Sequence, residues 1–285
     1  MIQPIVSLVI STKNKDYEEV KKNIEKILEI SGNFELILID QNEDRRFANL
    51  LECFKSEKFF YFSQDKTGLA RGRNFGFEKS NGEWIIFFDD DAYLDKNKFI
   101  LVLDFLVKSN DECCFFGQVK INDTNKDYLT RATHRQKLDF FHFDGVCSIA
   151  LVFSRKILEK VGLFDENFGV GSIYGAGEEA DLILRILKNN FKINYLSNLI
   201  TFHPKDVKNI SKMESYGFGL GAVYRKNLDF RNFIFLFPKF LIEIFGRLFL
   251  SLKDFLLIKK DNFHYHYLKG FISGFTKYEK NITSK

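Results

Sequence analysis

The sequence predicts an α/β protein with a mostly parallel central sheet, flanked by helices, and a helical extension after the sheet. Three observations predict it: short apolar runs alternate with helical patterns, acidic residues follow two of these runs, and strand signals stop near Pro204. Such alternation implies parallel strands joined by right-handed crossovers. A chain of 285 residues can form one large domain or two smaller ones. We expect a first domain over residues 1–205 and a helical, Phe-rich region over residues 206–285.

The first predicted strands are short and apolar, and a helical pattern separates each from the next. Strands are expected at Ile5–Ile10, Phe34–Ile39, Phe59–Phe62 and Trp84–Phe88, and helices at Tyr17–Leu28, Phe47–Phe54 and Thr67–Lys79. Ligands of such sheets bind beyond the carboxyl ends of the strands. Asp40 and Asp89–Asp91 follow two of these strands, so we expect acidic side chains on one rim of the sheet.

Beyond residue 96 the pattern is mixed. The expected elements are a helix at Ile100–Leu106, strands at Cys113–Val119 and Val146–Phe153, a helix at Glu178–Lys188, and short edge strands at Lys192–Leu196 and Leu199–His203. The polar stretch Asn122–His142 is expected to form a loop over the site. After Pro204 we expect only helices, at Ser211–Asn227 and Asn232–Ile258.

Composition excludes several classes of protein. The chain is 45% hydrophobic and 28% charged, which is typical of globular proteins and not of disordered ones. Its net charge of +4 is too small to indicate a nucleic-acid partner. The four cysteines have no CxxC spacing, which favours free thiols in a reducing cytosol over a zinc ribbon or a disulfide scaffold. The first residues lack a basic region, so we expect no signal peptide.

The segment Phe87–Asp95, with the sequence FFDDDAYLD, places three carboxylates after a buried strand. Such close negative charges repel one another unless a cation lies among them. Mg²⁺ and Mn²⁺ bind one or two carboxylates together with substrate phosphates. The alternative is an Asp cluster that turns the chain, with Asp95 as the N-cap of the next helix.

The segment Gly68–Gly76, with the sequence GLARGRNFG, contributes Arg71 and Arg73 near the same rim. Guanidinium groups are natural partners for a diphosphate. The alternative is a basic helix face in contact with solvent.

Five segments together resemble a known family. They are VSLVISTKNK (6–15), ELILIDQNED (35–44), GLARGRNFG (68–76), EWIIFFDDDAYLD (83–95) and the stretch 164–204 that contains GAGEEADL. In this order they resemble the family 2 glycosyltransferases of GT-A fold, whose sheet is Rossmann-like. The resemblance covers residues 5 to about 205.

The resemblance implies roles for residues that bind the donor. Asp40 would contact the nucleotide base, although a turn or helix-capping role remains open, and Gln41–Glu43 depart from the usual Asp-Gly-Ser. Thr12 would line the nucleotide pocket, where Ser11–Asn14 replace the usual Pro-Thr-Tyr-Asn.

The same resemblance assigns the metal site. Asp91 would be a direct metal ligand. Asp89, also a candidate metal ligand, would face the ribose or a metal-bound water, with Asp90 between it and Asp91 in the donor site. His203 would be a ligand of the metal or the pyrophosphate, with a purely structural histidine as the alternative. Arg71 and Arg73 would assist the departing diphosphate.

The resemblance also assigns the catalytic base. Glu179 occupies the position of the second acid in the family's Glu-Asp pair, so it would take the proton of the acceptor. Glu replaces Asp here and lengthens the side chain by one carbon. Glu178 would orient the acceptor or support the loop before it. The alternative is simply the acidic first turn of a helix, which the helix dipole favours.

The segment Asn232–Ile258 is rich in Phe and Leu, and Lys239, Glu243 and Arg247 recur every four residues in it. Such a helix has one narrow polar stripe. It is either packed against its own protein or a second copy, or it lies in a membrane interface. We favour peripheral association with an anionic membrane, with lysines 239, 253, 259, 260 and 269 meeting the lipid head groups.

The implied function is inverting, metal-dependent transfer of a sugar from a nucleotide-sugar donor to a hydroxyl of a saccharide or lipid-linked acceptor, in bacterial surface glycan synthesis. Mn²⁺ or Mg²⁺ would be the cofactor. Asp40 suits the imide of uracil, so UDP is favoured over GDP, and dTDP remains open. The expected location is the cytoplasmic face of the inner membrane.

Two alternatives remain. A nucleotidyltransferase would need a Gly-rich loop after the first strand, and Ser11–Asp16 contain no glycine. The other is a catalytically inactive protein that binds nucleotide sugars or acts as a scaffold.

Overall fold

A computed structural model describes residues 3–110, 112–122, 124, 126–128, 135–205, 207, 209–229, 232–259 and 261–279. The chain divides into two compact units. The first comprises Met1–Leu138, Gly145–Leu163 and Asn189–Lys205, and the second comprises Asp139–Asp144, Phe164–Lys188 and Asp206–Lys285. The domain boundary expected at residue 205 stays a prediction.

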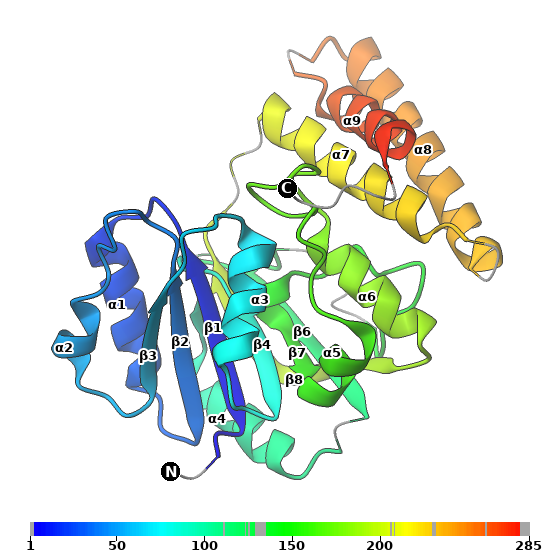
Figure 1. Ribbon diagram of the computed structural model, residues 1–285. Coiled ribbons are helices and arrows are strands. Elements are labelled where there is room, and N and C mark those ends of the chain that lie inside the picture. Colours follow the sequence, from blue (N-terminus) through cyan, green and yellow to red (C-terminus); the bar gives the residue numbers. More distant parts are fainter. Residues whose placement is uncertain are drawn as a thin grey trace. The chain divides into compact units, whose positions relative to one another are not determined.

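The first unit is built on a mixed eight-stranded sheet (Figure 1). Its strands are β1 (Val6–Thr12), β2 (Phe34–Asp40), β3 (Phe59–Ser63), β4 (Trp84–Phe88), β5 (Tyr93–Leu94), β6 (Cys113–Ile121), β7 (Leu151–Ser154) and β8 (Lys192–His203). Their order in the sheet is β3-β2-β1-β4-β7-β6-β8-β5. The pairs β2–β1, β2–β3 and β1–β4 are parallel, as alternating strands and helices predict, whereas β7 pairs antiparallel with β4 and β6.

Helices cover both faces of this sheet. In the first unit they are α1 (Tyr17–Leu28), α2 (Leu50–Phe54), α3 (Leu69–Lys79), α4 (Lys96–Val107) and α5 (Arg155–Val161). Alternate residues of β1, β2 and β4 share a hydrophobic core with the apolar sides of α1 and α4. On the opposite face α3 approaches β1 so closely that a Cβ on Gly76 would lie 2.2 Å from Val9 Cγ1. Because the central strands β1, β2 and β4 are covered on both faces, every residue in them is buried.

The structure corrects two predicted elements. Lys192–Leu196 and Leu199–His203 are not separate edge strands but one strand, β8, which pairs with β6 on one side and β5 on the other. Its register against β6 shifts between Phe116 and Gln118, and this irregularity lies level with the break that the sequence suggested. The strand expected at Val146–Phe153 begins as a 3₁₀ turn at Ser148–Ala150 and becomes β7 only afterwards.

The loop expected at Asn122–His142 lies partly outside the described residues. Its described parts form two isolated bridges, Lys120 with Asp127 and Lys137 with Asn194. Its role as a cover over the site stays a prediction.

The carboxyl ends of the central strands lie level with one another. Thr12 at the end of β1 pairs with Asp40 at the end of β2, and Phe88 at the end of β4 pairs with Ile10. The aspartates that follow Phe88 therefore emerge beside the end of β1.

The second unit contains α6 (Glu178–Lys188), α7 (Ile210–Asn227), α8 (Phe233–Leu256) and α9 (Phe263–Lys277). Figure 1 shows α7, α8 and α9 side by side. Among the described residues, no helix combines the length and the apolar content that crossing a bilayer requires.

Glycines allow α7 and α9 to pack backbone against backbone. On α7, a Cβ at Gly217 would lie 2.0 Å from the carbonyl oxygen of Tyr267, and one at Gly221 equally close to that of Phe271. On α9, Gly270 and Gly274 approach the carbonyl oxygens of α7 in the same way. Both helices thus carry glycines four residues apart, a spacing that brings two helix axes close together.

We expect Gly274→Ala to lower the free energy of unfolding by about 1–3 kcal/mol, because the added methyl would overlap the Phe218 carbonyl oxygen, 1.9 Å away, and force the helices apart. Gly246→Ala on α8 is the matched control. Nothing lies within 4 Å of a Cβ there, so helix propensity should make it neutral or stabilising by up to about 1 kcal/mol. Urea unfolding followed by circular dichroism measures both, and equal effects would contradict the close packing.

Candidate functional site

The three aspartates after β4 each contact a different partner. Asp89 accepts a hydrogen bond from Arg73 Nη2 at 2.9 Å, and Asp90 accepts one from the Thr12 hydroxyl at 2.7 Å. Asp91 Oδ2 accepts one from Lys15 Nζ at 2.7 Å. The carboxylates are therefore fixed by groups from β1, the residues after it, and α3.

His203 lies in the same cluster although it is more than a hundred residues away in sequence. The antiparallel pairing of β5 with β8, in which Tyr93 is opposite Phe202, carries the end of β8 back to the aspartates. His203 Nε2 lies 3.3 Å from Asp91 Oδ1 and 3.8 Å from Asp89 Oδ2. The structure thus brings together Asp89, Asp91 and His203, the predicted metal ligands.

The chemistry of this cluster fits a divalent cation. One oxygen of Asp89, one of Asp91 and one nitrogen of His203 all lie within 4.8 Å of one another. His203 Nδ1 lies 2.7 Å from the carbonyl oxygen of Pro204 and donates to it, which leaves Nε2 toward the carboxylates. Metal-binding histidines are oriented by such a bond in general. Two carboxylates and an imidazole suit Mn²⁺.

Charge in the cluster is balanced within the protein. Hydrogen bonds from His203 and Lys15 outweigh burial and hold the pKa of Asp91 well below its usual range. Burial alone would lower the pKa of His203, but Asp91, the Pro204 carbonyl and Asp89 together raise it. Burial raises the pKa of Asp90 despite its contacts with Thr12 and Lys15.

Lys15 is a site residue that sequence reasoning missed. Its Nζ lies 2.7 Å from Asp91 and 3.3 Å from Asp90. Burial would lower the pKa of Lys15, but the hydrogen bond to Asp91 and the two negative charges raise it. In the sequence, Lys15 could have been noticed only as a basic residue just after the first strand, which ends beside the strand that the aspartates follow.

The two arginines of α3 have different environments. Arg73 is 1% exposed and donates to Asp89 and to the Ser148 hydroxyl, at 2.9 and 2.7 Å, so it does not belong to a solvated helix face. Arg71 is partly exposed, and its Nη1 lies 3.5 Å from the carbonyl oxygen of Thr67. Arg71 is therefore the more exposed of the two arginines, and the role of both in binding the diphosphate stays a prediction.

Asp40 is fully buried and engaged in the turn after β2. Its Oδ1 accepts from the backbone and side-chain nitrogens of Asn42, and its Oδ2 accepts from the Phe47 nitrogen and the Tyr61 hydroxyl. These contacts support the turn role that the sequence left open. A contact from Asp40 to the nucleotide base stays a prediction.

Gln41, which stands where the sequence departs from the family pattern, holds the loop before α3. Its side-chain oxygen accepts from the Gly68 nitrogen, and its amide lies within hydrogen-bond distance of Gln64 and of the Gly68 carbonyl. It thereby fixes the start of the helix that carries Arg71 and Arg73.

Glu178 and Glu179 begin α6 in the second unit and differ in exposure. Glu178 is 4% exposed and lies against Gly169, where a Cβ would come within 3.2 Å of its carboxylate. Glu179 is partly exposed. Gly169 and Gly177 both have positive φ, which glycine adopts without strain. Of the two carboxylates, Glu179 is the more accessible to a substrate, and the roles of both stay predictions.

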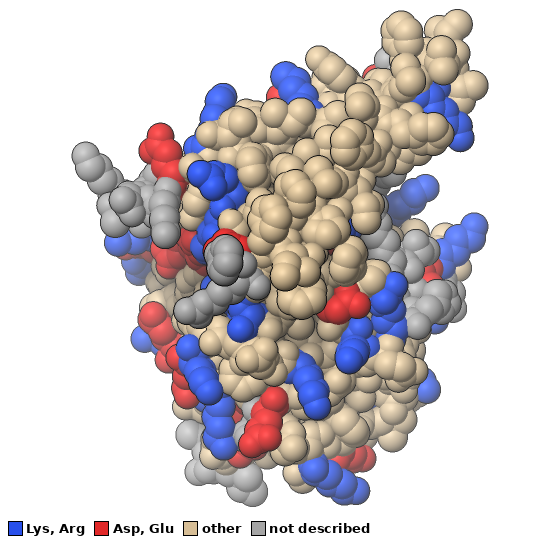
Figure 2. Space-filling model, turned by 90° about the vertical axis from the view of Figure 1, so that its right-hand side faces the viewer, with Lys and Arg blue, Asp and Glu red and all other residues tan. Residues whose placement is uncertain are grey.

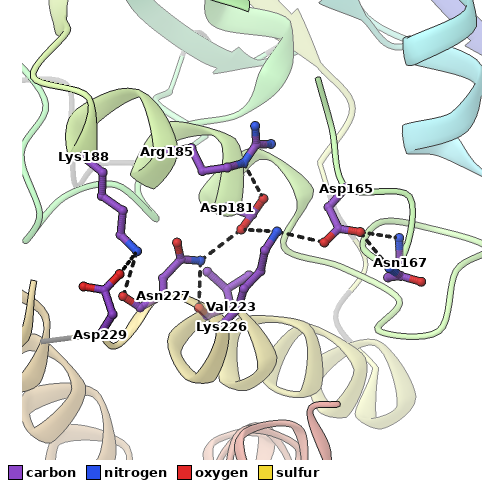
Figure 3. Close-up of polar contacts among 9 residues, drawn as sticks. All are labelled: Asp165, Asn167, Asp181, Arg185, Lys188, Val223, Lys226, Asn227 and Asp229. Carbon is purple, nitrogen blue, oxygen red and sulfur yellow. Dashed lines mark hydrogen bonds and ion pairs between the residues drawn. The ribbon is translucent and has the colours of Figure 1, made fainter. Parts of the chain in front are cut away.

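A buried charge cluster holds the first turns of α6 (Figure 3). Asp181 is fully buried and contacts Arg185 at 2.9 Å, Lys226 at 2.8 Å and Asn227 at 3.0 Å. Lys226 also contacts Asp165 at 2.8 Å. Burial would raise the pKa of Asp181, but the positive charges of Arg185 and Lys226 lower it. The cluster joins α6 to α7 two residues after Glu179.

We expect Asp181→Asn to lower the free energy of unfolding by about 3 kcal/mol at pH 7, because two cations lose their buried counter-charge. Since folding lowers the pKa of Asp181, its stabilisation is present above the ordinary aspartate pKa and is lost as pH falls through the lowered value. Wild type and variant should therefore converge in acid. Urea unfolding at pH 7 and at low pH measures this.

Asp229→Asn is the matched control for Asp181→Asn. Asp229 pairs with Lys188 in the same region, but its side chain is 51% exposed, so we expect less than about 1 kcal/mol (Figure 3). Equal effects of the two substitutions would contradict a special role for the buried cluster.

We expect Lys15→Met to tighten the binding of Mn²⁺ to the free protein about 10-fold, because the ammonium group repels a dication held by the neighbouring Asp91. The paramagnetic resonance signal of unbound Mn²⁺ in a titration measures this. Lys13→Met removes the same charge from an exposed position and should change little. Weaker binding by Lys15→Met would mean that Lys15 orients Asp91 and does not oppose the cation.

Comparisons with known proteins agree with this architecture. The crystal structure of GalNAc-T7 with UDP, GalNAc and Mn²⁺ matches with a TM-score of 0.58 and 14% identity, over 78% of this chain and 48% of that one. An uncharacterized glycosyltransferase of Rickettsia bellii (strain RML369-C) is 28% identical over 195 residues, 65% of this chain and 26% of that protein. The probable glycosyltransferase YdaM of Bacillus subtilis (strain 168) is 21% identical over 222 residues, 71% and 51% of the two proteins.

The chain spans only about a quarter to a third of the length of its Rickettsia relatives. The predicted α/β glycosyltransferase fold, GT-A, is confirmed. The family model described as glycosyl transferase family 2 matches residues 7–162, more than half of the chain and the part that carries β1, the aspartates and α3. The chain therefore belongs to glycosyl transferase family 2.

Proposed function

We propose that this protein is an inverting, metal-dependent glycosyltransferase that moves a sugar from a nucleotide-sugar donor to a hydroxyl group. One observation carries the proposal: Asp89, Asp91 and His203 converge at the carboxyl edge of the sheet in a chain of this family. A divalent ion held there is suited to a donor that carries a diphosphate.

UDP is the favoured nucleotide of the donor. The fold neighbour GalNAc-T7 was crystallised with UDP, GalNAc and Mn²⁺, which supports the choice for this chain by analogy of fold. Asp91, Asp89 and His203 would hold Mn²⁺ or Mg²⁺, which would supply positive charge to stabilise a departing diphosphate.

The residues around the metal ligands have a positioning role in this proposal. Arg73 is buried and donates to Asp89, and the Thr12 hydroxyl donates to Asp90, so both carboxylates have hydrogen-bond partners within the protein. Lys15 adds a positive charge next to Asp91. Preorganised charge of this kind needs no rearrangement when the leaving group becomes negative.

Glu179 is the proposed general base. Its carboxylate takes the proton of the acceptor hydroxyl while the acceptor oxygen attacks the anomeric carbon, on the face opposite the departing diphosphate. The bond from the sugar to the diphosphate breaks as the new glycosidic bond forms, so the configuration inverts. Glu178, buried against Gly169, supports the loop before α6.

The proposed acceptor is a saccharide or a lipid-linked saccharide of bacterial surface glycan synthesis, and the proposed location is the cytoplasmic face of the inner membrane. The apolar residues of α8 support a membrane location, because many of them are exposed.

The test is release of UDP from a panel of UDP-sugars with Mn²⁺, compared with dTDP-, GDP- and CMP-sugars. We expect Glu179→Gln to lower turnover at least about 100-fold, because a general base contributes that much or more. The thermal shift on UDP binding should remain, since the substitution leaves the metal ligands intact. Glu159→Gln, the same change at an exposed position of α5, is the control.

Removal of divalent ions with EDTA should abolish turnover, and added Mn²⁺ should restore it. Full turnover in EDTA would remove Asp91 from the proposed role. Near wild-type turnover by Glu179→Gln, with normal UDP binding, would show that another group is the base. A chain that neither binds nor cleaves any nucleotide sugar would favour the scaffold alternative.

A further inference from the structure

The outward surface of α8 is apolar along the whole helix. Large hydrophobic side chains that are at least one-third exposed occur from its first turn to just beyond its last: Phe233, Ile234, Phe235, Ile242, Phe245, Leu248, Phe249, Leu250, Leu252, Phe255, Leu256, Leu257 and Ile258. Ile234, Phe249 and Phe255 are 76%, 69% and 74% exposed. Figure 2 shows a broad uncharged area in the upper part of the view.

The charged residues of α8 point the other way. Lys239, Glu243 and Asp254 are less than 9% exposed, and Arg247 is only partly exposed. These are four of the five charged residues of the helix. The stripe that the sequence placed at every fourth residue is therefore the inner face of α8.

Partners within the second unit satisfy these inward charges. Lys239 contacts Asp144 at 3.2 Å, and Arg247 contacts Glu243 at 3.0 Å. The Arg247 guanidinium also lies 4.0 Å from the centre of the Tyr267 ring on α9. Ion pairs and a cation–π contact therefore satisfy the charges of the polar stripe inside the protein, without contact with water.

This polarity is the reverse of that of a helix on the surface of a water-soluble domain, where the apolar side faces the core. At about 100° of rotation per residue, the exposed apolar positions within α8 span roughly 260° of its circumference, or about 200° without Leu250. Thirteen bulky side chains offer on the order of 1,000 Å² of apolar surface, more than the few hundred that monomeric proteins expose in one patch.

We propose that the outward face of α8 docks on an anionic lipid bilayer, with the helix axis parallel to the membrane plane. The charge pattern fits this partner: the exposed charged residue of α8 is Lys253, and both acidic residues of α8 are buried. Lys259, which follows the helix, contacts Asp254 and keeps about half of its side chain exposed. Interfacial helices combine such an apolar face with basic residues at its margin. The proposal names the surface where the proposed transferase meets its acceptor, and in that respect it rests on the proposed function.

A second copy of the chain fits this surface less well. Helix pairs in coiled coils bury a narrow seam, two positions in seven, whereas this face is wide and carries large aromatic rings. The run Phe255–Ile258 is exposed on all sides of the helix end. Fluid acyl chains cover such an irregular surface without matching its shape.

Flotation of the full chain with vesicles tests the proposal. We expect the wild type to float with phosphatidylcholine vesicles that contain about 30 mol% phosphatidylglycerol, and more weakly with phosphatidylcholine alone. Phe245→Ser with Phe249→Ser should lower the bound fraction at least about 10-fold, because both rings leave the lipid interface. Leu101→Ser with Val107→Ser, a matched pair of exposed positions on α4, should float like the wild type.

Fluorescence gives an independent measure of insertion. Trp84 is the chain's single tryptophan and is 1% exposed, so it contributes a constant background. The indole introduced by Phe249→Trp should be quenched by brominated lipid, whereas Trp84 should not. A wild type that fails to float, or an unquenched indole, overturns the proposal.

Two further measurements separate the alternatives. If sedimentation without lipid shows a dimer that Phe245→Ser with Phe249→Ser converts to a monomer, the second copy covers α8 and the proposal is wrong. The thermal shift with UDP and Mn²⁺ should be equal in the wild type and in this variant. If the chain floats but binds no nucleotide sugar, membrane docking is supported and the proposed function is wrong. If the chain binds a nucleotide sugar but does not float, only the docking proposal is wrong.

Discussion

The concentration of negative charge after β4 is the constraint on which the candidate site depends. Three successive carboxylates at a strand end repel one another, and in this fold each of them contacts at least one positive or hydrogen-bond-donating group. Arg73 comes from α3, Thr12 and Lys15 from the first strand and the turn after it, and His203 from β8. The site is therefore a property of the whole sheet edge. The level carboxyl ends of β1 and β4 and the pairing of β5 with β8 are what make it possible.

The sequence predicted the parallel half of the sheet well. The spacing of apolar residues and the length of each apolar run are enough to distinguish short buried strands from amphipathic helices. β1, β2, β3 and β4 lie where the apolar runs placed them, and the acidic residues lie at the predicted rim. The mixed half was harder to predict. β5 has two residues and exists because β8 offers it an edge, a tertiary cause that leaves no trace in a local pattern. The sequence divided β8 in two for a local reason, since polar Ser197 and Asn198 interrupt its apolar run.

Some residues of the candidate site could be predicted from the sequence, and others depend on contacts between distant segments. Asp89, Asp91 and His203 could be named from motifs, because each stands at the end of a strand. Lys15 and Gln41 could not, because a lysine in a turn and a glutamine after a strand acquire meaning only through their neighbours in space. For Asp40 the structure adds contacts that the sequence did not reveal. Its oxygens accept hydrogen bonds from Asn42, Phe47 and Tyr61, and its contact with a nucleotide base stays a prediction. In α8 the sequence located the polar stripe, but only packing shows that the stripe faces the protein.

The position of His203 at the end of the last long strand of the sheet affects how the protein matures. The aspartates leave the ribosome more than a hundred residues before the histidine does, and β8 must insert between β6 and β5 before imidazole and carboxylates meet. Contacts between such distant segments form late, because closing a long loop costs entropy that only the finished sheet repays. In a nascent or partly folded chain the aspartates are therefore present before the imidazole joins them, and the set of predicted metal ligands is incomplete. If the cluster binds a divalent cation as proposed, its full affinity requires the complete sheet.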